Sequence, residues 1–191
     1  MKALSGRSKK CEVCPNRFVP TRTFQTWCSP DCAVQIAKAA RAKDRKREVA
    51  AKREKLKTRQ EWLKEVQTVF NRYIRERDHN QPCISCGRFM NCGDLLTGSR
   101  WDSGHYRSVG SCPALRFNAL NCHRQCVNCN RDKSGNAVEY RIGLIKRIGI
   151  NLVEWLEQEH QPNKYTIDEL KEMKKRYSKM ARDLKKQRES T

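Results

Sequence analysis

Apolar side chains recur at helical spacing through the middle of the chain. Between Arg59 and Asp78 they fall three or four positions apart, which places them on one face of a helix. The sequence therefore predicts an amphipathic helix over this range, with its aromatic face packed on a core, and Gln81-Pro82 ends it. The residues of this face are Trp62, Val66, Val69, Phe70, Tyr73 and Ile74.

The C-terminal part of the chain carries the same helical pattern. One helix is expected over Val138–Ile148, and a short second helix opens at Asn151. Thr166-x-x-Glu169 is a capping box that begins the last helix, because the two side chains satisfy free backbone N–H groups. The apolar stripe of this helix is expected to pack on the domain, with a dimer seam as the alternative. The stripe consists of Ile167, Leu170, Met173, Tyr177, Met180 and Leu184.

The segment 36–60 has no continuous apolar stripe and is strongly basic. It carries eleven Lys and Arg residues against three acidic ones, and it contains no Gly or Pro. Its composition predicts a solvated helix. Such a helix serves either as a partly frayed linker or as an arm along a phosphate backbone, and the charge favours the arm. The candidate nucleic-acid-binding residues are Arg41, Arg45, Lys46, Arg47 and Arg53.

The charge of the whole chain indicates a polyanionic partner. Among 191 residues, 41 are Lys or Arg and 21 are Asp or Glu, which gives a formal net charge of +20. We expect no membrane interaction, because no segment approaches the roughly 20 apolar residues that span a bilayer. The first residues are basic without an apolar signal-peptide core, so we expect a cytoplasmic protein that meets nucleic acid.

Eight of the eleven cysteines form four close pairs whose spacing is typical of zinc ligands. In a reducing cytosol, such pairs bind metal more often than they form disulfides. We therefore expect two structural Zn²⁺ sites, which stabilise a chain too poor in apolar residues for a large core. Cys92, Cys112 and Cys122 stand alone and are expected to pack as small hydrophobes. The expected ligands are Cys11, Cys14, Cys28 and Cys32 in one site and Cys83, Cys86, Cys126 and Cys129 in the other.

The expected fold class is α+β, with a small zinc-stapled ββα core flanked by helices. The stretch from Cys83 to Asn136 is expected to form two short strands and a helix that begins near Cys126. Ser29-Pro30-Asp31 begins a helix that carries Cys32, the last ligand of the first site. Four segments are expected: an N-terminal zinc knuckle (1–35), the basic helical arm (36–60), the ββα domain with its leading helix (61–137) and a helical C-terminal region (138–191).

Polar residues inside the second cysteine frame form a candidate nuclease site. Phosphodiester hydrolysis needs a base that activates water, and the pKa of a residue such as His105 lies near working pH. A cation such as Mg²⁺ or Mn²⁺, held by a carboxylate and an amide oxygen, would stabilise the leaving group. If zinc unites the cysteine pairs, Asp102 and Asn130 bind this cation and His105 stays free. The alternative is a strand-end turn with a hydrogen-bonded His105, which the flanking pairs disfavour.

These residues resemble the HNH nucleases, a family with a ββα-metal fold and a His at the end of its first strand. The resemblance implies that His105 is the catalytic base, that Asn121 braces the loop carrying it, and that Asn130 is a metal ligand. Asn118 is a rival for the bracing role. The acid departs from the commonest form of the family, because Asp102 precedes the His by three residues instead of one.

Further DNA contacts are expected around this centre. Arg107 and Arg116 are candidate phosphate clamps, since an arginine can bind phosphate through two N–H groups. By resemblance, Lys133 holds the basic position downstream of the last cysteine pair. His123 matches no position of the motif, so we expect it on the surface or behind the site residues.

Longer motifs resemble the NinG (Rap) recombination proteins of lambdoid phages. The N-terminal knuckle ends in Trp-Cys-Ser-Pro-x-Cys, the core contains Trp-Asp-x-Gly-His-Tyr-Arg, and Cys-x2-Cys-Asn leads to Lys-Ser-Gly-Asn. The resemblance implies a structure-specific endonuclease that cuts branched double-stranded DNA, such as Holliday junctions and D-loops, during phage recombination. The location would then be the cytoplasm of the host cell.

The expected partners follow from this activity. Symmetrical cleavage of a junction needs two active sites, so we expect a homodimer on DNA, and host recombination proteins are further candidate partners. The competing hypothesis is a non-catalytic two-zinc adaptor or regulator that binds DNA through its basic helices. An RNA-binding protein is less favoured, because aromatic platforms for bases are scarce.

Overall fold

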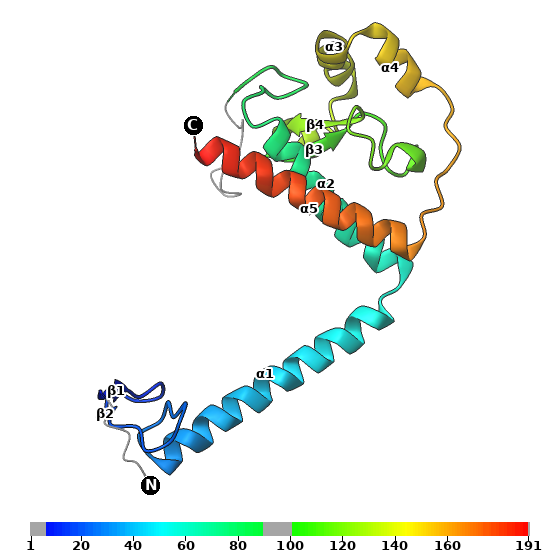
Figure 1. The fold of residues 1–191 in the computed structure, drawn as a ribbon. Coiled ribbons are helices and arrows are strands. Elements are labelled where there is room, and N and C mark those ends of the chain that lie inside the picture. Colours follow the sequence, from blue (N-terminus) through cyan, green and yellow to red (C-terminus); the bar gives the residue numbers. More distant parts are fainter. Residues whose placement is uncertain (1–6, 90–100, 191) are drawn as a thin grey trace. The chain divides into compact units, whose positions relative to one another are not determined.

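Helices make up most of the chain, and its sheets are small. The computed structural model describes residues 7–89 and 101–190, within which two two-stranded sheets accompany the helices (Figure 1). The chain divides into two compact units, one up to Lys57 and one from Thr58 onward. Each unit contains one cluster of four cysteines. The α+β class expected from the sequence is confirmed.

The first unit consists of a short strand pair and one long helix. Strand β1 (Lys9–Lys10) pairs antiparallel with β2 (Arg17–Phe18), and helix α1 (Pro30–Leu56) follows. Ser29 caps α1, since its Oγ accepts a hydrogen bond of 3.3 Å from the N–H of Cys32. Because Pro30 also suits the first helical turn, the helix begins where the sequence predicts.

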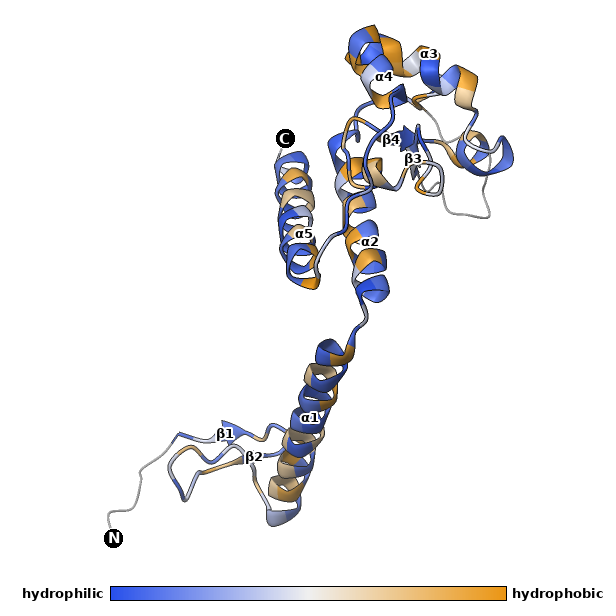
Figure 2. Cartoon of the chain, turned by 90° about the vertical axis from the view of Figure 1, so that its right-hand side faces the viewer, coloured by the Kyte–Doolittle hydropathy of each residue, from blue (hydrophilic) through white to orange (hydrophobic). Residues whose placement is uncertain are grey.

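Helix α1 is exposed along almost its whole length. Cys32 is its only buried residue, and polar residues cover the helix with apolar ones scattered among them (Figure 2). It ends at Leu56, where Lys57 adopts extended backbone. The helix therefore owes its formation to good helix formers and its cap instead of to a packed face.

The second unit is built on two helices that pack along each other. Helix α2 (Arg59–Arg77) and helix α5 (Ile167–Glu189) lie side by side in both views (Figures 1 and 2) and share one core. Each begins with a capping box, at Thr58 and at Thr166. The apolar stripe of α5 is thus used within the chain, as expected. The shared core contains Trp62, Leu63, Val66, Phe70, Ile74, Phe117, Cys122, Leu170 and Tyr177.

A strand pair lies against α2. Strand β3 (Asp102–His105) and strand β4 (Cys122–Gln125) are antiparallel. On one face of the pair, Ser103 Oγ donates a hydrogen bond of 2.6 Å to the carbonyl of Asn71 in α2. On the other face, the His123 ring packs edge-on against a tyrosine of the next helix. The two expected strands are therefore present and lie between helices.

Two further helices form the second core. Helix α3 (Ala137–Ile148) and helix α4 (Ile150–Glu157) pack over the turn that carries Cys83 and Cys86, here called the knuckle. Gly143 allows this approach, because a Cβ there would collide with the carbonyl oxygen of Ile84. The core contains Ile84, Cys112, Leu115, Tyr140, Leu144, Val153 and Leu156. Cys112 and Cys122 are buried among apolar residues, as expected, whereas Cys92 lies outside the described residues.

A helical segment begins close to Cys126, as expected, but it is short, and the longer helix α3 starts separately at Ala137. Only a short π-helical turn, Asn128–Asp132, follows β4. The reason is local, because Ser134, Gly135 and Asn136 have φ angles of 49°, 88° and 45°. Three left-handed residues in succession cannot continue a right-handed helix. The ββα order is kept, but a turn separates the last zinc ligand from the helix.

None of the helices in the described ranges combines the length and the apolar character that crossing a bilayer requires.

Candidate functional site

The first cysteine cluster has the geometry of a zinc site. Its Sγ atoms all lie within 4.8 Å of one another, and those of Cys14, Cys28 and Cys32 are 3.4 to 3.9 Å apart. Zn–S bonds of about 2.3 Å place tetrahedral sulfurs about 3.8 Å apart. The N–H of Val13 lies 3.4 Å from Cys11 Sγ and lowers the pKa of that thiol to about 6, which favours the thiolate. Donor set and spacing therefore fit a structural Zn²⁺.

The second cluster joins the knuckle before β3 to the end of β4. The Sγ atom of Cys126 lies 3.6 Å from that of Cys83 and 3.9 Å from that of Cys86, and all four ligands, with Cys129, lie within 4.8 Å. Burial opposes charge on Cys83, but backbone N–H groups outweigh it and lower the pKa of this thiol. These four thiols also fit a structural Zn²⁺. A metal bound by these thiols would hold the strand pair to the knuckle.

Asp102 and Asn130 come together beside this cluster. The Nδ2 of Asn130 donates a hydrogen bond of 2.8 Å to Asp102, and Arg131 donates to both oxygens of the same carboxylate, also at 2.8 Å. Burial opposes the charge, but these two partners outweigh it and lower the pKa of Asp102. An ionised carboxylate beside an amide is a donor set that suits a hard divalent cation. The guanidinium of Arg131 neutralises that carboxylate.

His105 lies at the end of β3 with a different set of neighbours. Its Nε2 is 3.1 Å from the carbonyl oxygen of Arg116, and its Nδ1 is 3.7 Å from the Sγ of Cys122. A carbonyl only accepts hydrogen bonds, so Nε2 carries the proton and Nδ1 carries the lone pair. Burial of the ring lowers the pKa of His105. The neutral imidazole is therefore the favoured form.

The strand separates His105 from the candidate cation ligands. Successive side chains of a strand point to opposite faces, so Asp102 and His105 lie on opposite faces of β3. Among the described residues, neither hydrogen bond of His105 reaches Asp102 or Asn130. The structure thus brings together two of the four predicted catalytic residues and leaves the imidazole apart from them.

Asn121 ties down the segment that follows His105. It is completely buried, its Oδ1 accepts a 2.8 Å hydrogen bond from the N–H of Arg107, and its Nδ2 donates to the carbonyls of Arg107 and Leu115. Within 7–89 and 101–190, the Asn118 side chain makes a single, local hydrogen bond, accepting at 2.8 Å from an N–H two residues later. The geometry therefore suits Asn121 better than Asn118 for bracing.

Of the predicted phosphate contacts, some side chains are used within the fold and others are exposed. The Nη1 of Arg107 donates to the carbonyls of Leu156 and Glu157 and thereby closes the C-terminal end of α4. The guanidinium of Arg107 therefore binds backbone carbonyls and has a structural role. Arg116 donates from Nε to Gln67 and sits beside the imidazole. Lys133 and the basic side chains of α1 named above are exposed.

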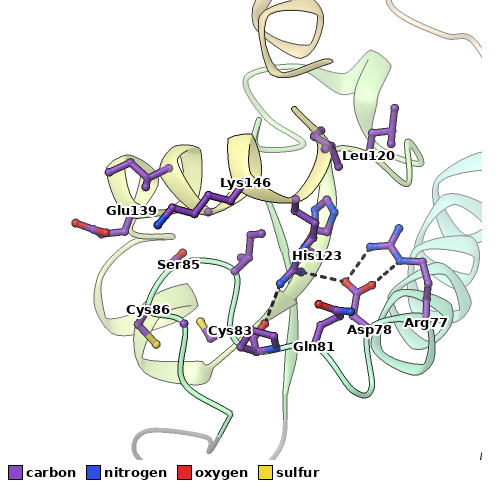
Figure 3. Close-up of a pocket in the computed structure, with 17 residues that line it drawn as sticks. Arg77, Asp78, Gln81, Cys83, Ser85, Cys86, Leu120, His123, Glu139 and Lys146 are labelled. Carbon is purple, nitrogen blue, oxygen red and sulfur yellow. Dashed lines mark hydrogen bonds and ion pairs between the residues drawn. The ribbon is translucent and has the colours of Figure 1, made fainter. Parts of the chain in front are cut away.

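The sequence reading missed a buried ion-pair network at the end of α2. Asp78 is 4% exposed and receives hydrogen bonds of 2.6 and 2.8 Å from Arg77 and one of 3.0 Å from the N–H of Arg124. Burial opposes its charge, but Arg77 outweighs it and lowers the pKa of Asp78. The network borders a cavity of about 830 Å³ between α2, the knuckle and α3 (Figure 3). It anchors α2 to β4. The sequence does not predict this network, because an acidic residue that follows a helix is usually exposed to solvent.

His123 is buried, so the expectation that it lies on the surface is wrong. Its side chain is 3% exposed and borders the same cavity (Figure 3), and no described residue hydrogen-bonds its Nδ1. Burial lowers the pKa of His123 to about 3, so the ring is neutral. Its place follows from strand alternation, because it shares the inner face with Gln125.

Comparison with known proteins gives one family. The family described as "Bacteriophage Lambda NinG protein" matches residues 3–189. "Protein ninG" of Salmonella phage P22 is 41% identical over 202 residues, which cover 96% of each chain. "Protein ninG" of Escherichia phage lambda is 41% identical over 200 residues, which cover 95% of each chain. The protein of that name from Escherichia phage 933W is 39% identical over 198 residues, which cover 94% of this chain and 95% of the relative. No solved structure matches.

Proposed function

The chain belongs to the family of the bacteriophage lambda NinG protein, and from this premise and the site geometry we propose that it is an HNH-like, metal-dependent endonuclease that cuts branched double-stranded DNA in phage recombination. One observation carries the proposal. A four-cysteine cluster pins the β3–β4 pair so that His105 ends β3 while Asp102 meets Asn130. These are the residue types that phosphodiester hydrolysis needs.

Each residue has a distinct task in this proposal. His105 takes a proton from the attacking water at Nδ1, because the carbonyl of Arg116 keeps the other proton on Nε2. Asn121 holds the backbone that follows His105. Asp102 and Asn130 would hold Mg²⁺ or Mn²⁺, which when bound neutralises charge on the phosphate and the leaving oxygen.

In the structure, Arg131 occupies the carboxylate that would bind the cation. It occupies both carboxylate oxygens of Asp102, so a cation must compete with this guanidinium. DNA supplies phosphate oxygens, which an arginine binds as readily as a carboxylate. Arrival of DNA can thus release Asp102. Because a symmetrical cut needs two such sites, the proposed working form is a homodimer on the junction.

Replacement of His105 by Ala tests the proposed base. The full chain is incubated with a labelled synthetic four-way junction in Mg²⁺, with a reaction that lacks added divalent cation as the blank, and products are resolved on a denaturing gel. Loss of a general base should slow cutting by roughly 100-fold or more. Binding measured without added Mg²⁺ or Mn²⁺ should change little, since His105 is not a predicted phosphate contact.

His160→Ala is the matched control, because His160 is a partly exposed histidine against Trp155, distant in sequence from the site. It should cut at the parental rate. If His105→Ala also cuts at that rate, the assignment of the base is wrong.

A second function is favoured by one observation. The lone pair of His105 faces the Cys122 thiol, and Arg131 holds Asp102, so the described groups are not aligned on a common point. A non-catalytic two-zinc DNA-binding adaptor would need no such alignment. The same assay separates the two functions: an adaptor binds the junction and gives no product with Mg²⁺ or Mn²⁺.

A further inference from the structure

A second cavity, lined by four arginines, opens beside Asp102. Its volume is about 560 Å³. Against the four guanidinium groups stand two carboxylates, so the lining carries excess positive charge. None of the arginines was among the predicted DNA contacts. The lining residues are Arg75, Glu76, His79, Trp101, Asp102, Arg124, Arg131 and Arg188.

Ion pairs account for two of the arginines. Arg131 pairs with Asp102 at 2.8 Å, and Arg188 pairs with Glu76 at 2.6 Å. Both carboxylates of the lining are thereby used. The charges of Arg75 and Arg124 are left without a carboxylate of their own in the cavity.

Of these two arginines, Arg75 has fewer partners. Its side chain forms no hydrogen bond or ion pair of standard length with any residue in 7–89 or 101–190, although this side chain is partly buried. Burial lowers the pKa of Arg75, and the charge of Asp102 partly offsets this effect. An unpaired guanidinium in a partly buried position is costly and calls for an anion.

Arg124 is held in place with part of its donor capacity unused. Its Nη1 donates to the backbone carbonyls of Asp78 and His79, and its guanidinium stacks 3.8 Å from the ring centroid of Trp101. Its Nε is buried and has no partner among the described residues. The group is therefore immobilised beside the cavity before any ligand arrives, which reduces the entropic cost of binding.

We propose that this cavity binds a phosphodiester group of the DNA backbone, with Arg75 as its principal contact and Arg124 beside it. The inference rests on the proposed function, because Asp102 belongs both to the cavity and to the candidate cation site. The bound phosphate is thus a neighbour of the one that is cut. Arginine suits this ligand, since its planar fork matches two phosphate oxygens. A neighbouring phosphate held in this way sets the register of the strand at the site.

Arg75→Gln and Arg72→Gln form a matched pair for the test. Both residues lie on α2, three positions apart, and both changes remove one positive charge, but Arg72 is exposed and does not line the cavity. Affinity for a fluorescent four-way junction is measured by anisotropy in buffer without added Mg²⁺ or Mn²⁺ and without chelator, so that no cutting occurs and the structural zinc is kept. Arg75→Gln should weaken binding about tenfold, and Arg72→Gln by less than about twofold.

Neutral methylphosphonate linkages then locate the contact. They are placed one at a time on either side of the branch. At one position the substitution should cost the parental protein about tenfold in affinity and cost Arg75→Gln nothing further, because the same contact is already lost. Arg75→Lys, which keeps the charge without the fork, should fall between the two proteins. Zinc content and thermal unfolding show that the variants are folded.

Equal losses in Arg75→Gln and Arg72→Gln would overturn the proposal, and so would a methylphosphonate cost that persists in full in Arg75→Gln at every position. A different result would contradict the proposed function alone. A protein that shows the expected binding pattern but gives no product with Mg²⁺ or Mn²⁺ would keep the phosphate site and lose the nuclease.

Discussion

At the scale of single residues, the inner face of β4 decides how the core closes. Gln125 is fully buried, and its Nε2 donates to the Ser85 hydroxyl at 2.8 Å and to the carbonyl of Gly135 at 2.7 Å. The opposite strand has Gly104, where a Cβ would collide with the Oε1 of Gln125. One amide thus joins the strand pair, the knuckle and the turn before α3. It can do so because Gly104, diagonally opposite on β3, has no side chain.

His123 makes stability depend on pH. Its pKa in the folded chain is about 3, against an ordinary value near 6.5, so below pH 6.5 the unfolded chain binds a proton that the folded chain does not. The free energy of unfolding should therefore fall as pH falls, by up to about 1.4 kcal/mol per unit from this group.

Urea unfolding between pH 7.5 and 5.5 measures this slope. His123→Phe keeps a ring against Tyr140 and should flatten the slope, whereas His160→Ala should leave it as it is. An unchanged slope in His123→Phe would show that other groups carry the pH dependence.

At the scale of elements, local signals set where helices begin. Thr58 and Glu61 form a reciprocal capping box at α2, with the Thr58 Oγ1 accepting from the N–H of Glu61 at 3.3 Å. The box at Thr166, read from sequence, is formed as well. The C-terminal limits are equally local, since Gly149 with φ of 85° separates α3 from α4. The helical segment after Cys126 also ends for a local reason, because left-handed residues separate it from α3.

Thr58→Ala measures the worth of one capping box. Loss of the cap should lower the free energy of unfolding of the second unit by about 1 kcal/mol, because an N–H at the helix start loses its partner. Chemical denaturation with tryptophan fluorescence is the measurement, since Trp62 lies in the affected core.

Thr68→Ala is the control on the same helix. The Thr68 hydroxyl donates to the carbonyl of Lys64 inside the helix, a bond that adds little to helix stability. Its replacement should be nearly neutral. Equal losses at both positions would mean that the cap contributes nothing specific.

At the scale of the whole molecule, each of the two units contains one four-cysteine cluster. The first joins the strand pair of the N-terminal unit to the start of α1, and the second joins the knuckle to β4. The α2–α5 core contains none of the cluster cysteines. A zinc ion bound in each cluster would therefore stabilise its own unit, and α1 displays its basic side chains along its length.

Cys28→Ser and Cys129→Ser separate the two metals. Each variant should bind one zinc per chain where the parental protein binds two, measured by metal analysis after dialysis. Cys129→Ser should lower the unfolding temperature of the second unit, whereas Cys28→Ser should leave the transition followed by Trp62 in place. A variant that loses both metals would show that the units are coupled.

What the sequence by itself determined is the set of features that depend on near neighbours. Helix periodicity, capping residues and cysteine spacing act over a few positions, so the helices, both cysteine clusters and the buried stripe of α5 were predictable. The family motifs likewise identified His105, Asp102, Asn121 and Asn130 as the residues to examine.

Only the tertiary structure decided which of these side chains meet. Strand alternation put His105 and Asp102 on opposite faces of β3, and packing turned Arg107 into a helix cap and His123 into a buried ring. Likewise, the arginine-lined cavity gathers residues from α2, β3, β4 and α5, along with the turn after β4. The physical reason is that charge pairing and burial depend on distances between segments far apart in sequence, which no local pattern encodes.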